Sequence, residues 1–238
     1  VLLFSSVQAD SKGFSAELQR HLDTVRNTYN IPGMSVAVYY QNKLQHTAVS
    51  GVRNIETGEP VKVDSAFQIG SVSKPVTASL AYVLSEKGIL PIDTKVLDVF
   101  PEMKEQSRPE YAHVDIRMLL THTSGMQYKP LTEPADAYKS LYPNDMRKRR
   151  IEYTKAAFRD KPIAPPGTKF EYGGGTIILA AMMERKTGKL WEELVDEYVF
   201  KELGLKTALP ANAWNGAKDR AWGHVVSNGK TIPWLFNG

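Results

Sequence analysis

Hydrophobic residues recur along the chain at two spacings, one typical of helices and one typical of strands. Apolar residues three to four positions apart predict a first helix at residues 14–29, which ends before Pro32. Residues 34–40 and 44–50 are rich in strand-forming residues on either side of a turn-like segment, which predicts an antiparallel hairpin. A short strand is expected at residues 66–69.

The middle of the chain returns to helical spacing. Residues 71–86 predict a helix with one apolar face, and Gly88 is placed to end it. Strand-forming stretches are nearly absent from about residue 90 to residue 200. Helical pieces between proline-rich loops are expected there at residues 116–121, 146–158, 176–187 and 191–203.

A second hairpin is predicted close to the last residue. Residues 222–226 are rich in strand formers, Asn228-Gly229 is typical of a type I′ turn, and residues 231–236 would form the returning strand. Two hairpins alone leave a sheet with an unpaired edge, so we expect further C-terminal strands beyond this chain. The predicted fold is mixed α/β, with an antiparallel sheet flanked by helices and a mostly helical subdomain at about residues 90–205.

The composition is that of an ordinary globular protein. The chain has 238 residues, 42% hydrophobic and 24% charged. Its formal net charge of +4 is spread along the chain, so no nucleic-acid partner is expected, and the basic run at residues 147–150 is interpreted as a solvated helix face. The chain contains no cysteine, which excludes disulfides and thiolate chemistry. The longest apolar run, residues 177–183, is far shorter than the ~20 residues of a membrane span.

The first residues resemble the end of a signal peptide. Residues 1–4 are apolar, and Val7 and Ala9 are spaced like the site at which a signal peptidase cleaves. We therefore expect a signal-peptide remnant at residues 1–9, a partial domain at residues 10–238, and a periplasmic or secreted protein. An ordinary apolar tail is the alternative interpretation of this segment.

A serine and a lysine three residues apart are the strongest candidates for chemistry. If a helix starts at Ser71, the side chains of Ser71 and Lys74 share one face, and the ammonium group could assist deprotonation of the hydroxyl. A helix N-terminus also favours developing negative charge. Ser227 and Lys230 have the same spacing, but they lie on the predicted hairpin, where helical geometry does not apply. Alternatively, Ser71 is a helix-capping serine and Lys74 a solvated lysine.

Four segments together resemble the class C β-lactamase, DD-peptidase and esterase family. The segment FQIGSVSKPVTA (67–78) looks like that family's nucleophile segment, and three others follow in the family's order. They are IRMLLTHTSGM (116–126), PPGTKFEYGGG (165–175) and WEELVDEYVFKELGL (191–205). The resemblance covers about residues 14–226. It implies a serine β-lactamase/DD-peptidase-like fold and a secreted serine hydrolase.

The resemblance also implies catalytic roles. Ser71 would attack a carbonyl carbon and form an acyl-enzyme, and Lys74 would help to remove the serine proton. Tyr172 matches the first residue of the family's Tyr-x-Asn triplet and would act as base and then as acid, with neighbouring cations stabilising its phenolate. The alternative for Tyr172 is a half-buried aromatic residue that packs ahead of a helix.

One position departs from the family pattern. The third residue of the triplet is Gly174, so a polar anchor is lost, and the three glycines at 173–175 are expected to open room for a different acyl group. Gly174 and Gly175 are therefore the predicted substrate-binding residues, and an ester or a D-amino-acid peptide is favoured over a β-lactam. A phosphate cradle at these glycines lacks the Lys-Ser/Thr pair that would follow it. His122, in LLTHTSG, is expected to be structural.

Other chemistries leave no signature. The five histidines show no H-E-x-x-H spacing and the chain has no G-x-S-x-G, so we expect no metal, no cofactor and no α/β-hydrolase site. The family's Lys/His-Thr/Ser-Gly element is not found and is expected beyond the last residue, which would leave this fragment inactive by itself. The expected partner is a small ester or amide, or a peptidoglycan-like substrate. The rival hypothesis is a non-catalytic penicillin-binding-like protein that binds muropeptide or a protein.

Overall fold

The computed structural model describes residues 11–127, 140–206, 208 and 220–234. These residues form two compact units, one from the described parts of 1–69 and 207–238 and the other from those of 70–206. The predicted signal-peptide remnant at residues 1–9 lies outside the described residues. Within the described ranges, no helix combines the length and the apolar character that crossing a bilayer requires.

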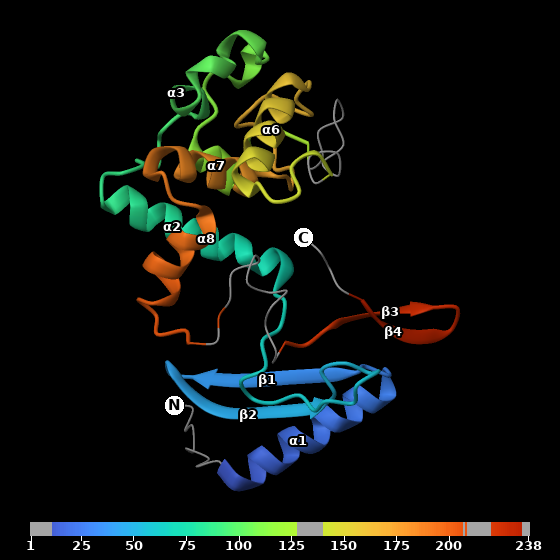
Figure 1. Cartoon of the computed structure of the whole chain (residues 1–238). Coiled ribbons are helices and arrows are strands. Elements are labelled where there is room, and N and C mark those ends of the chain that lie inside the picture. Colours follow the sequence, from blue (N-terminus) through green and yellow to red (C-terminus); the bar gives the residue numbers. More distant parts are fainter. Residues whose placement is uncertain (1–10, 128–139, 207, 209–219, 235–238) are drawn as a thin grey trace, which may run out of the picture. The chain divides into compact units, whose positions relative to one another are not determined.

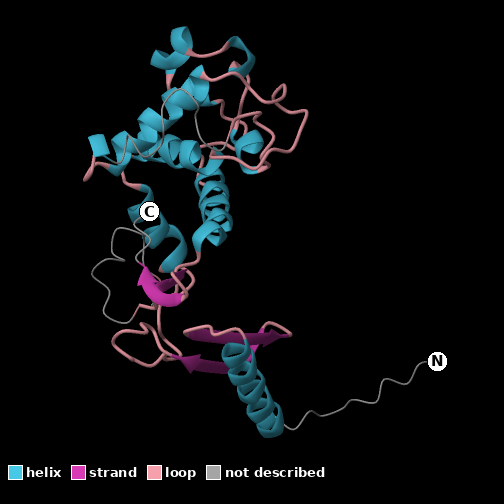
Figure 2. Ribbon diagram, turned by 90° about the vertical axis from the view of Figure 1, so that its right-hand side faces the viewer, coloured by secondary structure: helices cyan, strands magenta, loops and turns pink. Residues whose placement is uncertain are grey.

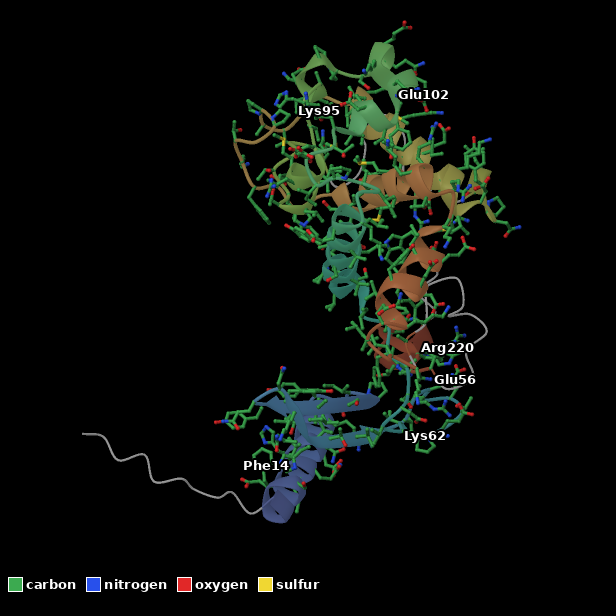
Figure 3. All side chains as sticks on the ribbon, turned by 90° about the vertical axis from the view of Figure 1, so that its left-hand side faces the viewer. Phe14, Glu56, Lys62, Lys95, Glu102 and Arg220 are labelled. Carbon is green, nitrogen blue, oxygen red and sulfur yellow. The ribbon has the colours of Figure 1, made fainter. Side chains whose placement is uncertain are left out.

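The first unit begins with the predicted helix and hairpin, both of which are confirmed. Helix α1 (Ser11–Thr28) lies along the antiparallel pair β1 (Gly33–Tyr40) and β2 (Lys43–Gly51) (Figure 1). The Gln19 amide of α1 donates a hydrogen bond to the Val49 carbonyl of β2 at 3.0 Å. Phe14, labelled in Figure 3, lies near the start of α1. Its ring contacts His46 of β2, with the ring centroids 4.6 Å apart. Helix and hairpin therefore bury a shared face.

The C-terminal hairpin is also confirmed. Strands β3 (Gly223–Ser227) and β4 (Lys230–Trp234) are antiparallel, and Asn228 and Gly229 between them have φ angles of 51° and 74°. Two successive positive φ angles are the signature of a type I′ turn. Residues 235 and 236 of the predicted returning strand lie outside the described residues.

The strand predicted at residues 66–69 is wrong. Ala66 makes one isolated parallel bridge to Arg220, and residues 67–69 have no strand assignment. A strand needs a partner along its length, and here the pairing partner is a single residue. The described residues contain two two-stranded sheets and many helices, which confirms the mixed α/β prediction.

The second unit is helical (Figure 2). Its longer helices are α2 (Ser73–Glu86), α6 (Met146–Arg159) and α7 (Gly175–Thr187). Gly88, with a φ of 68°, follows the end of α2 as predicted. The shorter elements are α3 (Val96–Val99), η2 (Pro101–Gln106), η3 (Pro109–Tyr111), α4 (Ile116–Leu120) and α8 (Trp191–Val195).

Helix α7 is the centre of this unit's core. Its residues 178–183 are all buried, and it packs against α2, α4, α6 and α8. A helix that is apolar on every side is stable only when other elements surround it. Tyr172 lies in the segment that leads into α7. The C-terminal end of that segment is therefore attached to a buried helix.

The helix predicted at residues 191–203 is only partly correct. After α8 the chain continues as a π-helical turn, η4 (Asp196–Phe200), instead of an α-helix. The Lys201 amide donates to the Asp196 carbonyl at 3.0 Å, five residues back. Such a wide turn adds one residue to the ring that each hydrogen bond closes.

The basic run at residues 147–150 is solvated only in part. Lys148 is exposed over the ring of Tyr142, as expected for a solvated face. Arg150, however, is buried and forms ion pairs with the buried carboxylates of Glu184 on α7 and Glu192 on α8. A buried guanidinium is stable only when it is paired in this way, so the solvated interpretation is wrong for Arg150.

Candidate active site

Ser71 lies on a tight turn immediately before α2. The turn is the 3₁₀ segment η1 (Gly70–Val72), and α2 begins at Ser73, two residues later than predicted. Gly70 has a φ of 50°, which suits glycine. The Ser71 side chain is exposed. Lys74 follows three residues later in the first turn of α2, and residues three apart on helical backbone lie on the same face, so Ser71 and Lys74 are neighbours.

The ammonium group of Lys74 contacts the serine hydroxyl. Lys74 Nζ donates a hydrogen bond to Ser71 Oγ at 3.2 Å. Lys74 is partly buried, in the first turn of α2, where Pro75 is tolerated because its amide would not be needed for a helical bond. The pair is therefore held by local backbone geometry and remains accessible to solvent at the hydroxyl.

Tyr172 completes the group. Lys74 Nζ lies 4.7 Å from the centroid of the Tyr172 ring, and Tyr172 as a residue is 43% exposed. Two hydrogen bonds lower the pKa of Tyr172 below its ordinary value: the one with Lys74 has the larger effect and the one with Ser71 the smaller. The structure thus brings together a hydroxyl, an ammonium and an acidified phenol, which are the three residues that the sequence analysis selected.

The imidazole ring of His122 contacts the phenol ring of Tyr172. Its ring centroid is 4.8 Å from that of Tyr172, and its backbone has a left-handed φ of 57°. From the sequence, His122 is expected to be a structural residue, and its contact with Tyr172 is not predicted. The family segment LLTHTSG was the available signal, but segment order alone does not place two side chains against each other.

The glycine triplet after Tyr172 is closely packed. Gly173, Gly174 and Gly175 are all buried. A Cβ atom on Gly174 would lie 1.7 Å from the phenol oxygen of Tyr153, and a Cβ atom on Gly175 would lie 2.6 Å from a backbone carbonyl oxygen. The room that these glycines were expected to open is therefore already filled beside each of them. That Gly174 and Gly175 bind substrate stays a prediction.

Tyr153 is a residue that sequence reasoning missed. It lies on α6, it is 5% exposed, and its phenol fills the direction in which a side chain at position 174 would point. Nothing in the spacing of the sequence connects α6 with the glycine triplet. Only the packing of α6 against α7 does so.

A metal centre finds no support in the described part of the chain. Those residues include no group of three or more histidine, aspartate or glutamate side chains arranged to hold an ion. The groups that meet at Ser71 are the hydroxyl, the Lys74 ammonium and the Tyr172 phenol.

Comparison with known proteins identifies the family. The model of the family described as Beta-lactamase matches residues 18–233. The chain belongs to the beta-lactamase family. Penicillin-binding protein 4 of Amycolatopsis lactamdurans is 32% identical over 195 residues, which are 82% of this chain and 49% of that protein. Esterase EstB of Burkholderia gladioli is 28% identical over 206 residues, 83% of this chain and 52% of the esterase.

Solved structures show the same fold. A class C beta-lactamase matches 97% of this chain and 59% of its own, with a TM-score of 0.71 and 24% identity. The octameric penicillin-binding protein homologue from Pyrococcus abyssi matches 93% of this chain and 50% of its own, with a TM-score of 0.74 and 23% identity. The beta-lactamase-family chain described here spans about half the length of the curated relatives it matches.

Proposed function

We propose that this chain carries the acylation site of a serine hydrolase that cleaves an ester or an amide through an acyl-enzyme on Ser71. The convergence of Lys74 and Tyr172 on an exposed serine hydroxyl supports this proposal. A nucleophile is activated in this way when a base lies within reach and a cation stabilises that base. The relatives named esterase, beta-lactamase and penicillin-binding protein support the same reaction class.

Acylation follows from the three side chains. The Tyr172 phenolate accepts the Ser71 proton while the serine oxygen forms a bond to the substrate carbonyl carbon, and the carbonyl π electrons move to its oxygen. When that oxyanion collapses, the bond to the leaving group breaks, and Tyr172 returns the proton to the departing alcohol or amine. The Lys74 ammonium donates to Ser71 Oγ and stabilises the phenolate.

This mechanism sets the pH dependence. Because Tyr172 acts as a base, acylation requires its phenolate, so the rate rises as pH increases through the Tyr172 pKa. Since Lys74 and Ser71 lower that pKa from 10, the rise occurs below pH 10. A Tyr172→Phe variant has no such base, and it serves as the reference that contains the hydroxyl and the ammonium alone.

For the substrate, we infer a small ester or a D-amino-acid peptide rather than a β-lactam. The triplet that starts at Tyr172 ends in Gly174, so it has no side-chain amide to hold a substrate amide. The esterase among the relatives agrees with this inference. We also propose that the protein is periplasmic or secreted, on the pattern of residues 1–9.

A covalent assay tests the nucleophile. We expect the full natural-length protein, incubated with p-nitrophenyl acetate, to gain one acetyl group at Ser71, detected by mass spectrometry of the peptides. Ser71→Ala should abolish this labelling. Ser79→Ala is the matched control, because Ser79 lies on α2 with an exposed hydroxyl that donates to the Pro75 carbonyl. Acetylation that persists in Ser71→Ala would rule out Ser71 as the nucleophile.

The same assay examines the rival function. A non-catalytic penicillin-binding-like protein would bind muropeptide or a protein partner without covalent labelling of Ser71. A wild-type protein that binds muropeptide in calorimetry, takes up no acyl group from esters or penicillins, and binds equally well as Ser71→Ala would support that rival and contradict the hydrolase.

A further inference from the structure

The turn that carries Tyr172 is fastened to His122 on both sides of the phenol. The Glu171 amide donates to the His122 carbonyl oxygen at 2.7 Å, and the Gly173 amide donates to the His122 ring nitrogen Nδ1 at 3.3 Å. Tyr172 is the residue between these two donors. One residue therefore fixes the backbone before and after the proposed base.

The imidazole ring also fixes the phenol itself. It contacts the Tyr172 ring at 4.8 Å, with the two planes inclined by 38°, and it meets the Phe170 ring edge-on at 5.7 Å. Aromatic pairs at these separations are attractive and orientation-dependent. The ring of Tyr172 therefore contacts both the Lys74 ammonium and the His122 imidazole.

The protonation state of His122 follows from these contacts. Because Nδ1 accepts the Gly173 hydrogen bond, it carries no proton, and the ring is neutral with its proton on Nε2. Partial burial, and after it the charge of Lys74, lower the pKa of His122. The charge that acts on the His122 ring is that of Lys74, and the titratable side chain in contact with the ring is Tyr172. The nearby carboxylate of Glu171 forms an ion pair with Lys169.

We propose that His122 is the positioning residue for the base, holding Tyr172 against Lys74 and Ser71 through its carbonyl oxygen and its unprotonated Nδ1. This inference rests on the proposed acylation mechanism, in which Tyr172 is the base. His122 touches none of the reacting atoms in it. It acts by keeping the phenol in place, and a displacement of about 1 Å in such a group costs roughly 10²-fold in rate.

At acid pH, protonation of His122 breaks its hydrogen bond with Gly173. Protonation of His122 puts a hydrogen on Nδ1, which then faces the Gly173 N–H instead of accepting from it. It also places a second cation near Lys74. Two protonations then stop acylation on the acid side, one at Tyr172 and one at His122, and the logarithm of the rate should steepen from a slope of about one to about two.

Two substitutions separate positioning from simple packing. His122→Asn keeps a residue that tolerates the left-handed φ of 57° and an amide oxygen that can accept from Gly173, but it cannot titrate. His122→Ala removes the acceptor and the ring. We expect His122→Ala to acylate about 10²-fold more slowly than wild type. We expect His122→Asn to acylate faster than His122→Ala and to keep a slope of about one across the acid limb.

The measurement is the burst rate with p-nitrophenyl acetate as a function of pH, on the full natural-length protein, with Ser71→Ala beside it. If Ser71→Ala still bursts, the proposed function is wrong. If Ser71→Ala does not burst and His122→Asn keeps the wild-type steepening, only the positioning role is overturned. If circular dichroism shows that His122→Ala does not fold, the pH profile of His122→Asn alone tests the positioning role. That variant keeps the backbone conformation and an acceptor for the Gly173 amide.

Discussion

The chain contains the same four-residue pattern, Ser-x-x-Lys, twice, and only one copy belongs to the candidate site. Ser71 lies on a 3₁₀ turn and Lys74 in the first turn of α2, which follows it, with a hydrogen bond between their side chains. Ser227 and Lys230 have the same spacing but are cross-strand partners on either side of a type I′ turn, in the other compact unit. The spacing alone therefore has no chemical meaning. The backbone conformation and the neighbouring phenol supply it.

Removing the lysine from each of the two Ser-x-x-Lys copies should give the largest difference, and this difference is in the acylation rate. We expect Lys74→Ala to lower the burst rate with p-nitrophenyl acetate by about 10²–10⁴-fold, because the phenolate of Tyr172 loses the cation that stabilises it. Lys230→Ala is the matched control and should leave the rate unchanged. Equal burst kinetics in both variants would mean that the ammonium at position 74 has no part in activating Ser71.

The same contrast applies to the basic run on α6, where neighbouring cations have different surroundings. Arg150→Met should lower the free energy of unfolding by about 3–5 kcal/mol, since it leaves the buried carboxylates of Glu184 and Glu192 without their cation. Lys148→Met, at an exposed position, should change it by less than about 0.5 kcal/mol. Urea unfolding followed by circular dichroism measures both. Comparable losses in the two variants would contradict the difference in burial.

A pair of glycines gives the smallest expected difference. Gly174→Asn should lower the free energy of unfolding by about 1–3 kcal/mol, because its Cβ atom would overlap the Tyr153 phenol. Gly188→Asn is the control: nothing lies within 4 Å of a Cβ atom there, and asparagine tolerates its φ of 74°. Thermal unfolding of the two variants provides the measurement. A Gly174→Asn protein as stable as Gly188→Asn would show that Tyr153 can move aside easily.

Much of the local structure could be predicted from the sequence. The stop at Gly88 and the turn at Asn228-Gly229 depend on φ angles that glycine and asparagine adopt readily, so the residue types themselves are informative. The proximity of Ser71 and Lys74 is also local, because three residues of helical backbone bring them together. Tyr172 could be selected only through the order of four family segments.

The sequence by itself determined the features that depend on only a few neighbouring residues: the helices, the two hairpins, and a lysine one turn from a serine. The tertiary structure alone decided which surroundings those residues meet. Tyr153 fills the space beside Gly174, His122 fastens the turn of Tyr172, and Arg150 is buried with two carboxylates. Each of these contacts joins residues far apart in the chain, and such contacts depend on how helices pack, which no local pattern of apolar and polar residues specifies.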